Sequence, residues 1–478
     1  MSFRKDFVWG SAAAAYQIEG AWNADGKGLS VWDMLTRQPG KIWEGHHGNV
    51  ACDHYHLYKD DVRLMRALGL KSYRLSVSWP RVMPNGTGAV NEAGIGFYDR
   101  LVDELLAAGI DPWVTLFHWD FPHELFLRGG WLNADSPKWF ADYTAVVVDR
   151  LSDRVSHWIT LNEPQCFIGL GHYAGEHAPG LKLGLSEVLL AAHHSLMAHG
   201  MSVQVLRARA KTKPVIGWAP VGHICYPVSN SPEDIDAARS ASMTVNPGSL
   251  WNNTWWGDPP VLGQYPEEGL QAYGKDVPKF TSSDMELIHQ PLDFYGVNIY
   301  SGAPTAACAE GKAVHDPMPP GHPHSLFLWK QTPEALYWGP KFLSERYKLP
   351  IVVTENGVSC HDSISLDGKV HDPSRVDFLN RYLLQLRAAA RDGVDVMGYF
   401  VWSILDNFEW AEGYKHRFGL VYVDYNTQKR IPKDSAYWYS EVIRTNGASL
   451  DGFAQESPAL LDSEEEAPSS VEPELVAN

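Results

Sequence analysis

The sequence predicts an α/β fold, a single (β/α)8 TIM barrel with elaborated loops at the C-terminal face of the strands. Eight short apolar runs recur along the chain, at residues 7–15, 72–79, 111–119, 157–162, 214–221, 292–300, 350–356 and 396–406. Stretches of helical spacing separate these runs, and strands that alternate with helices are typical of a parallel barrel. A doubly wound sheet is the alternative, but the chain has neither a G-x-G-x-x-G motif nor a Walker A loop.

The clearest helix is expected between Asp372 and Gly393. Asp372 suits the N-cap, Pro373 the first helical position and Gly393 the residue after the end. Between them, one apolar stripe runs through Val376, Leu379, Leu383 and Leu386. Similar signals predict helix starts at residues 332–334 and at Asp53, and a helix end at residues 107–109.

Composition indicates an ordinary globular protein with an acidic tail. Hydrophobic residues make up 45% and charged residues 20% of the 478 residues, enough to bury a large core. Seven of the 57 acidic residues and none of the 40 basic ones follow residue 455, within a segment rich in Ser, Pro and Ala. We therefore expect a barrel domain at residues 1–450 and an acidic, disordered tail at 451–478. The acidic body argues against a nucleic-acid partner.

The termini, cysteines and histidines indicate a cytoplasmic protein without a cofactor. The N-terminus MSFRKDFVWGS has no apolar signal region, and no stretch approaches a membrane span. Five scattered cysteines do not form a disulfide pattern. A metal site was considered for the histidines between residues 46 and 56, but their spacing matches no zinc motif. We expect no metal and no cofactor.

Polar and aromatic residues gather at the ends of seven of the eight apolar runs. They are Gln17 and Glu19, Arg74, His118 and Trp119, Asn162 and Glu163, Asn298 and Tyr300, Glu355 and Asn356, and Trp402 and Asp406. In a (β/α)8 barrel the residues that follow the strands line the ligand site. A single such residue would be unremarkable, but the repeated pattern predicts a site at this end of the barrel.

Two of these residues suit the cleavage of a glycosidic bond. Glu163 ends the fourth run and Glu355 the seventh, so both carboxylates can face one cavity. One would protonate the leaving oxygen while the other attacks the anomeric carbon or activates water there. Arg74 is expected to hold Glu355 ionised, and Pro164 to keep the backbone of Glu163 extended. A lone glutamate after a strand is more often a surface or salt-bridge residue, so the joint pattern carries this interpretation.

Longer motifs give the sequence a family resemblance. FVWGSAAAAYQIEGA, VTLFHWDFP, TLNEP, DFYGVNIY, VTENG and WSILDNFEWAEGY occur in this order between residues 7 and 414. Together they resemble glycoside hydrolase family 1, the β-glucosidase and β-galactosidase family. The resemblance extends from about residue 7 to residue 446, nearly the whole chain.

The resemblance implies roles for individual residues. Glu163 resembles the general acid/base, Glu355 the nucleophile, and Arg74 and Tyr300 the residues that contact that nucleophile. The residues that resemble the sugar-binding residues of the family are Gln17, His118, Asn162, Glu409 and Trp410. Trp402 resembles the tryptophan that stacks beneath the sugar. Trp119, Asn298 and Phe418 are further expected substrate contacts, and Trp329 resembles a tryptophan on the aglycone side.

The expected function is that of a retaining β-glycosidase, most simply a β-glucosidase acting on cello-oligosaccharides or aryl and alkyl β-glucosides in cellulose degradation. A β-galactosidase or β-fucosidase of the same family is the alternative, and a non-catalytic sugar-binding barrel is a further one. Glu163 excludes the thioglucosidases that carry glutamine there, and Glu409 argues against a 6-phosphorylated sugar. The expected partner is a small-molecule β-glycoside, without nucleic acid or membrane. The sequence does not decide whether the chain forms a homo-oligomer.

Overall fold

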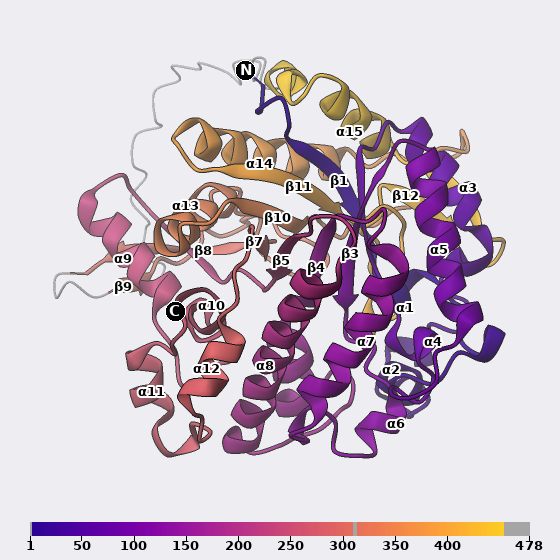
Figure 1. Cartoon of the computed structure of the whole chain (residues 1–478). Helices are drawn as coiled ribbons and strands as arrows, with labels where there is room; N and C mark the ends of the chain where they lie inside the picture. The colour runs from indigo at the N-terminus through magenta and orange to yellow at the C-terminus, as the bar shows by residue number, and fades with distance from the viewer. Residues whose placement is uncertain (1, 309–312, 454–478) are drawn as a thin grey trace, which may run out of the picture.

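The computed structural model describes residues 2–308 and 313–453. Eight parallel strands form the centre of the protein, and helices surround them (Figure 1). The strands are β1 (Val8–Ala12), β2 (Ser72–Ser76), β3 (Asp111–Phe117), β4 (His157–Asn162), β5 (Val215–Ala219), β7 (Tyr295–Asn298), β10 (Ile351–Asn356) and β11 (Val396–Trp402). Each strand lies inside one of the eight apolar runs, which confirms the predicted (β/α)8 barrel.

The strands pair in the order that a barrel requires. Neighbouring strands run β5-β4-β3-β2-β1-β11-β10-β7, and every pair is parallel. Between β5 and β7, which end this order, the Asp293 N–H donates to the Ile216 carbonyl at 2.8 Å, and a bridge joins Val221 to Asn298. The barrel is therefore nearly closed, and all its strands end at the same face.

Aromatic side chains fill the interior of the barrel. The Trp113 ring lies 5.4 Å from that of Phe294 and 5.0 Å from that of Phe400, centroid to centroid. Gly217 and Gly10 make room for these rings, because a Cβ atom at either position would lie 2.4 Å from a Phe294 or Phe400 ring carbon. The barrel is a packed core, so a ligand can enter only at its ends.

The principal helices lie around the strands (Figure 1). They are α3 (His54–Ala67), α5 (Glu92–Ala107), α7 (Ser136–Leu151), α8 (Leu185–Arg209), α13 (Ala335–Tyr347), α14 (Pro373–Arg391) and α15 (Asp434–Arg444). The predicted apolar stripe of α14 is buried along its whole length. Gly109, at the predicted end of α5, has a φ of +75°, which glycine adopts without strain.

Two helices begin at the predicted N-cap residues, but the side chains of those residues do not make the capping hydrogen bond that was expected. Asp53 and Asp372 are the N-cap residues of α3 and α14, but neither side chain caps its helix. The Asp53 carboxylate contacts His56, and that of Asp372 accepts from the Ser435 backbone N–H at 2.8 Å. At Asp53 a histidine in the first helical turn competes with the cap, and at Asp372 a distant serine does.

Insertions after β5, β7 and β11 elaborate the face where the strands end. After β5 the chain forms β6 (Ile224–Pro227), α9 (Pro232–Met243), α10 (Asn253–Leu262), α11 (Glu267–Tyr273) and α12 (Ser282–Ile288). After β7 come β8 (Gly302–Ala307), which pairs with β6, and β9 (Ala313–His315), which pairs with β8. After β11 comes the hairpin of β12 (Val421–Asp424) and β13 (Lys429–Pro432). None of these was predicted from the sequence. A helical turn, η7 (Ala448–Phe453), crosses the predicted boundary at residue 450, and residues 454–478 lie outside the described residues.

Within residues 2–308 and 313–453, no helix is both long and apolar enough to cross a membrane. The same residues contain no group of three or more His, Cys, Asp or Glu side chains arranged to hold a metal ion. His54, one of the histidines considered for a metal, is buried and hydrogen-bonded to Asp61 at 2.7 Å. All five cysteines are unpaired.

Candidate active site

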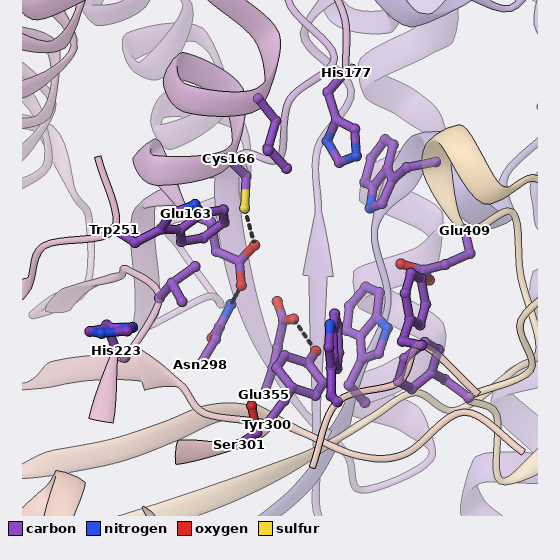
Figure 2. Close-up of a pocket in the computed structure, with 18 of the residues that line it drawn as sticks. Glu163, Cys166, His177, His223, Trp251, Asn298, Tyr300, Ser301, Glu355 and Glu409 are labelled. Carbon is purple, nitrogen blue, oxygen red and sulfur yellow. Dashed lines mark hydrogen bonds between the residues drawn. The ribbon is translucent and has the colours of Figure 1, made fainter. Parts of the chain in front are cut away.

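A cavity of about 610 Å³ opens at the face where the barrel strands end (Figure 2). Eleven of the fourteen residues to which the sequence assigns a catalytic or substrate-binding role line it: His118, Trp119, Glu163, Asn298, Tyr300, Trp329, Glu355, Trp402, Glu409, Trp410 and Phe418. Glu19, Asn356 and Asp406, which also end apolar runs, do not line it. The other three, Gln17, Arg74 and Asn162, are hydrogen-bonded to residues of the lining. The structure thus brings all fourteen together, from segments that span most of the chain.

Glu355 receives strong hydrogen bonds on both of its carboxylate oxygens. It lies next to the end of β10, and its side chain is buried. Arg74 Nη1 donates to Oε1 at 2.5 Å, and the Tyr300 hydroxyl donates to Oε2 at 2.7 Å. Arg74 lies inside β2 rather than at its end, and its Nη2 donates to Asn162 Oδ1 at 2.5 Å. A charged donor and a hydroxyl donor both stabilise the ionised carboxylate.

Glu163 receives weaker, uncharged donors. Asn298 Nδ2 donates to Oε1 at 2.7 Å, and the thiol of Cys166 donates to Oε2 at 3.1 Å. Figure 2 shows the carboxylate between these two partners and facing the same cavity as Glu355. No cation contacts it directly among the hydrogen bonds and ion pairs of the described residues.

The backbone at Glu163 corrects a sequence prediction. Its φ is +46°, in the left-handed region, whereas Pro164 was expected to keep it extended. The Glu163 N–H donates to the Ala219 carbonyl at 2.8 Å, and its own carbonyl accepts from Cys166 N at 2.9 Å. These tertiary and turn bonds hold a conformation that a non-glycine residue rarely adopts. Trp119 and Trp410, with φ of +78° and +49°, are strained in the same way. Such strain is concentrated at functional sites.

The surroundings of the two carboxylates shift their pKa values differently. Burial, together with the charge of Glu355, raises the pKa of Glu163 to about 8. Burial also raises the pKa of Glu355, but the Arg74 charge and the Tyr300 hydrogen bond oppose that rise. Glu355 is therefore the carboxyl that ionises first, and Glu163 retains the shared proton at neutral pH.

A polar cluster adjoins the carboxylates. Gln17 Nε2 donates to Asn407 Oδ1 at 2.9 Å and lies 3.4 Å from Glu409 Oε2. Asn162 Nδ2 lies 3.0 Å from His118 Nε2, and burial and the charge of Arg74 lower the pKa of His118 well below its usual range. Burial and the charges of Glu355 and Glu163 raise the pKa of Glu409 to about 8. At neutral pH this cluster therefore offers amide, imidazole and carboxyl groups, the donors and acceptors that sugar hydroxyls need.

Aromatic rings form the rest of the wall. The Trp402 and Trp410 rings each lie 5.8 Å from the His118 ring, and the Trp119 ring lies 4.4 Å from that of Trp410. On another side, Trp329 stacks on Phe327 at 4.6 Å and is 38% exposed. Flat apolar walls beside a polar cluster suit a ligand with hydroxyls at its edge and apolar faces.

Sequence reasoning missed several lining residues, among them Cys166, Glu176, His177, His223, Trp251, Phe327 and Glu412. Most lie on loops inserted after the strands, where no local pattern predicts which side chain turns inward. Cys166 is an exception, because it lies three residues after Glu163 in a helical segment, η4 (Gln165–Ala174). Among the residues that the structure describes, the lining contains five glutamates but neither lysine nor arginine. It therefore disfavours an anionic ligand.

Comparison with known proteins agrees with this geometry. The family model described as glycosyl hydrolase family 1 matches residues 1–448. The chain is 44% identical to a 1,4-beta-D-glucan glucohydrolase of Thermotoga neapolitana, over 93% of this chain and 99% of the relative. It is also 44% identical to beta-glucosidase A of Thermotoga maritima, over 93% of this chain and 98% of the relative.

A solved structure of a Thermotoga maritima beta-glucosidase in complex with glucoimidazole superposes with a TM-score of 0.86. It is 43% identical in sequence and covers 93% of this chain and 99% of its own. The match of the family model over nearly the whole chain, with relatives above 40% identity, shows that this chain belongs to glycosyl hydrolase family 1.

Proposed function

We propose that this chain is a retaining β-glucosidase that removes terminal non-reducing β-D-glucosyl residues from cello-oligosaccharides or from aryl and alkyl β-glucosides. The unequal surroundings of its two carboxylates carry the proposal. Glu355 is held by a guanidinium and a hydroxyl, whereas Glu163 has only neutral donors and a raised pKa. A retaining glycosidase needs one ionised nucleophile and one protonated acid within a single cavity.

In the first step, a carboxylate oxygen of Glu355 attacks the anomeric carbon while Glu163 gives its proton to the departing glycosidic oxygen. The bond to the aglycone breaks and a glycosyl ester with Glu355 forms. In the second step, the ionised Glu163 takes a proton from water, and that water attacks the anomeric carbon and releases Glu355. Arg74 and Tyr300 orient Glu355 throughout, since each holds one of its oxygens.

The sugar in this proposal is unphosphorylated glucose. Gln17, His118, Asn162, Glu409 and Trp410 would bind its hydroxyls, and Trp402 would stack beneath its ring. Asn298, Trp119 and Phe418 complete the walls around it, and Trp329 contacts the aglycone. A 6-phosphate would meet an acidic lining in which no described residue is a lysine or an arginine. The β-glucosidase names of the relatives support glucose as the sugar.

The two carboxylates can be tested by chemical rescue. Glu163→Ala should retain the first step with an aryl glucoside whose leaving group departs without protonation, and azide should restore turnover as the β-glucosyl azide. Glu355→Ala should be inactive with every substrate unless azide replaces the nucleophile and gives the α-azide. Equal behaviour of the two variants would refute the assignment of acid and nucleophile.

The sugar and the stereochemistry need a separate experiment. Initial rates should be measured on aryl β-glucoside, β-galactoside and β-fucoside, with cellobiose and lactose alongside, and NMR should identify the anomer released first. We expect the glucosides to be preferred and the β-anomer to appear first. An α-anomer would refute the retaining mechanism, and a preference for galactosides would refute the proposed sugar.

We also propose a cytoplasmic location and a role in cellulose degradation, with soluble cello-oligosaccharides as substrates. The five unpaired cysteines support a reducing compartment. Residues 1–450 would form the catalytic unit, so removal of residues 451–478 should leave kcat/KM unchanged. Recovery of the enzyme outside the cell, by fractionation of the native source, would contradict this location.

A further inference from the structure

Cys166 is the only cysteine in the described lining of the cavity, and it contacts one of the two carboxylates directly. Its Sγ lies 3.1 Å from Glu163 Oε2, and its side chain is 5% exposed. Its backbone N–H also donates to the Glu163 carbonyl at 2.9 Å. Two bonds therefore fix the thiol relative to Glu163, one through the backbone and one through the carboxylate, and Figure 2 shows the second.

We propose that Cys166 is a positioning residue for Glu163, whose thiol holds Oε2 so that its free lone pair, which carries the catalytic proton, faces the cavity, and which eases the return of Glu163 to the ionised state. This inference rests on the acid/base role proposed above for Glu163. It adds to that role a reason why the proton faces the substrate.

The hydrogen bonds of Glu163 determine where its proton can lie. Oε1 accepts a 2.7 Å bond from the Asn298 amide, whose own Oδ1 accepts from the Thr354 hydroxyl at 2.6 Å, so the amide is fixed as the donor. The amide is the stronger and closer donor, so it lowers the proton affinity of Oε1 more than the thiol lowers that of Oε2, and the proton of the acid is favoured on Oε2. The Cys166 thiol takes one lone pair of Oε2 and leaves the other for a proton directed into the cavity.

The thiol keeps this donor role over the working pH range. Burial, the Glu163 charge and its hydrogen bond raise the pKa of Cys166 well above its usual value. The sulfur therefore remains a thiol and does not compete with Glu163 for its proton. It is also too weakly ionised to act as a nucleophile in place of Glu355.

The pH dependence of the reaction follows from this contact. A donor to the carboxylate stabilises the ionised form and lowers the pKa of Glu163, opposing the effect of burial. A general acid must be protonated, so kcat/KM falls as pH rises through its pKa. Removing the thiol should raise that pKa and move the fall to higher pH, whereas a hydroxyl, a stronger donor, should keep it in place or move it lower.

The test compares Cys166→Ala and Cys166→Ser with the native enzyme on two β-glucosides. One is a methyl or phenyl glucoside that needs protonation of its leaving group, and the other is a 2,4-dinitrophenyl glucoside that does not. The basic limb is the fall of kcat/KM at high pH. For Cys166→Ala with the first substrate, we expect this limb to move to higher pH by about half a pH unit to one pH unit. At the optimum, kcat/KM should fall about three- to tenfold on this substrate and much less on the second. Cys166→Ser should restore both the limb and the rate.

Cys225→Ala is the matched control, because Cys225 is buried in β6 and does not line the cavity. It should leave both pH profiles unchanged. An unmoved basic limb in Cys166→Ala, or an equal loss of kcat/KM on both substrates, would overturn the role of Cys166. If the pH profiles of kcat/KM of the native enzyme were the same on the two substrates, the proposed acid role of Glu163 would fail instead.

Discussion

The buried ion pair between Arg74 and Glu355 offers the most direct test of how the nucleophile is kept ionised. Arg74 is 1% exposed, and besides Glu355 it donates to Asn162 Oδ1, Thr115 Oγ1 and the Thr354 carbonyl. Arg74→Met retains most of the side-chain volume and removes the charge and every one of these bonds. Glu355 is then left with the Tyr300 hydroxyl as its strong donor.

The structure sets the size of the effect. Removing one partner of a buried ion pair costs about 3–5 kcal/mol, because the remaining charge is left without compensation. The carboxyl can avoid this cost by taking up a proton, at about 1.36 kcal/mol for each unit of pKa. We therefore expect the pKa of Glu355 to rise by roughly two units or more. At neutral pH, kcat/KM should fall by about two to four orders of magnitude.

The assay is the pH profile of kcat/KM on an aryl β-glucoside. A nucleophile must be ionised, so its activity is present above its pKa and lost as pH falls through it. The acid limb is the fall of kcat/KM at low pH. In Arg74→Met this limb should move to higher pH, and part of the lost kcat/KM should be recovered at that higher pH. Arg81→Met is the matched control, since Arg81 forms an equally buried pair with Glu19 at 2.8 Å but does not line the cavity. It should lower thermal stability and leave the acid limb in place. An unmoved acid limb in Arg74→Met would refute the reasoning.

Two further predictions concern specificity and the barrel core. Because burial raises the pKa of Glu409 to about 8, the preference for a β-glucoside over its 6-phosphate should increase as pH rises through that value. Glu409→Gln should abolish this trend, and a persisting trend would show that another group repels the phosphate. Gly217→Ala places a Cβ 2.4 Å from the Phe294 ring, so urea unfolding should show a loss of about 1–3 kcal/mol. Gly452→Ala, whose Cβ meets nothing within 4 Å, should have no such effect, and equal stability of the two variants would contradict the packing argument.

The fold could be predicted because its signals are local. Each strand of the barrel is a short apolar run that is buried on both faces, and such a run is visible in its own few residues. The helix α14 is equally visible in its spacing and its Pro373 start. The insertions that carry β6, β8 and β9 were not predicted, since these strands are short and their burial depends on pairing with distant segments.

Much of the candidate site could be located by the same reasoning. Parallel strands end at one face, so residues such as Glu163 and Glu355 had to meet there once the strands were known. The residues expected to bind the sugar were identified from the resemblance to a family and not from the physics of the chain. The wall residues Trp251 and His223 were missed, because they lie on loops whose course is decided by packing.

The strands, their order and the two carboxylates at their ends can be read from the amino-acid sequence, because apolar periodicity and chain order are properties of neighbouring residues. The groups that those carboxylates contact cannot, because they come from distant parts of the chain. Arg74 and Glu355 are 281 positions apart, and Asn298 and Glu163 are 135 apart, yet these contacts set which carboxyl is ionised. The left-handed backbone of Glu163 also depends on the bond from its N–H to the Ala219 carbonyl, which forms only when β4 and β5 lie side by side. Charge and hydrogen bonding act through space, and only the folded chain fixes those distances.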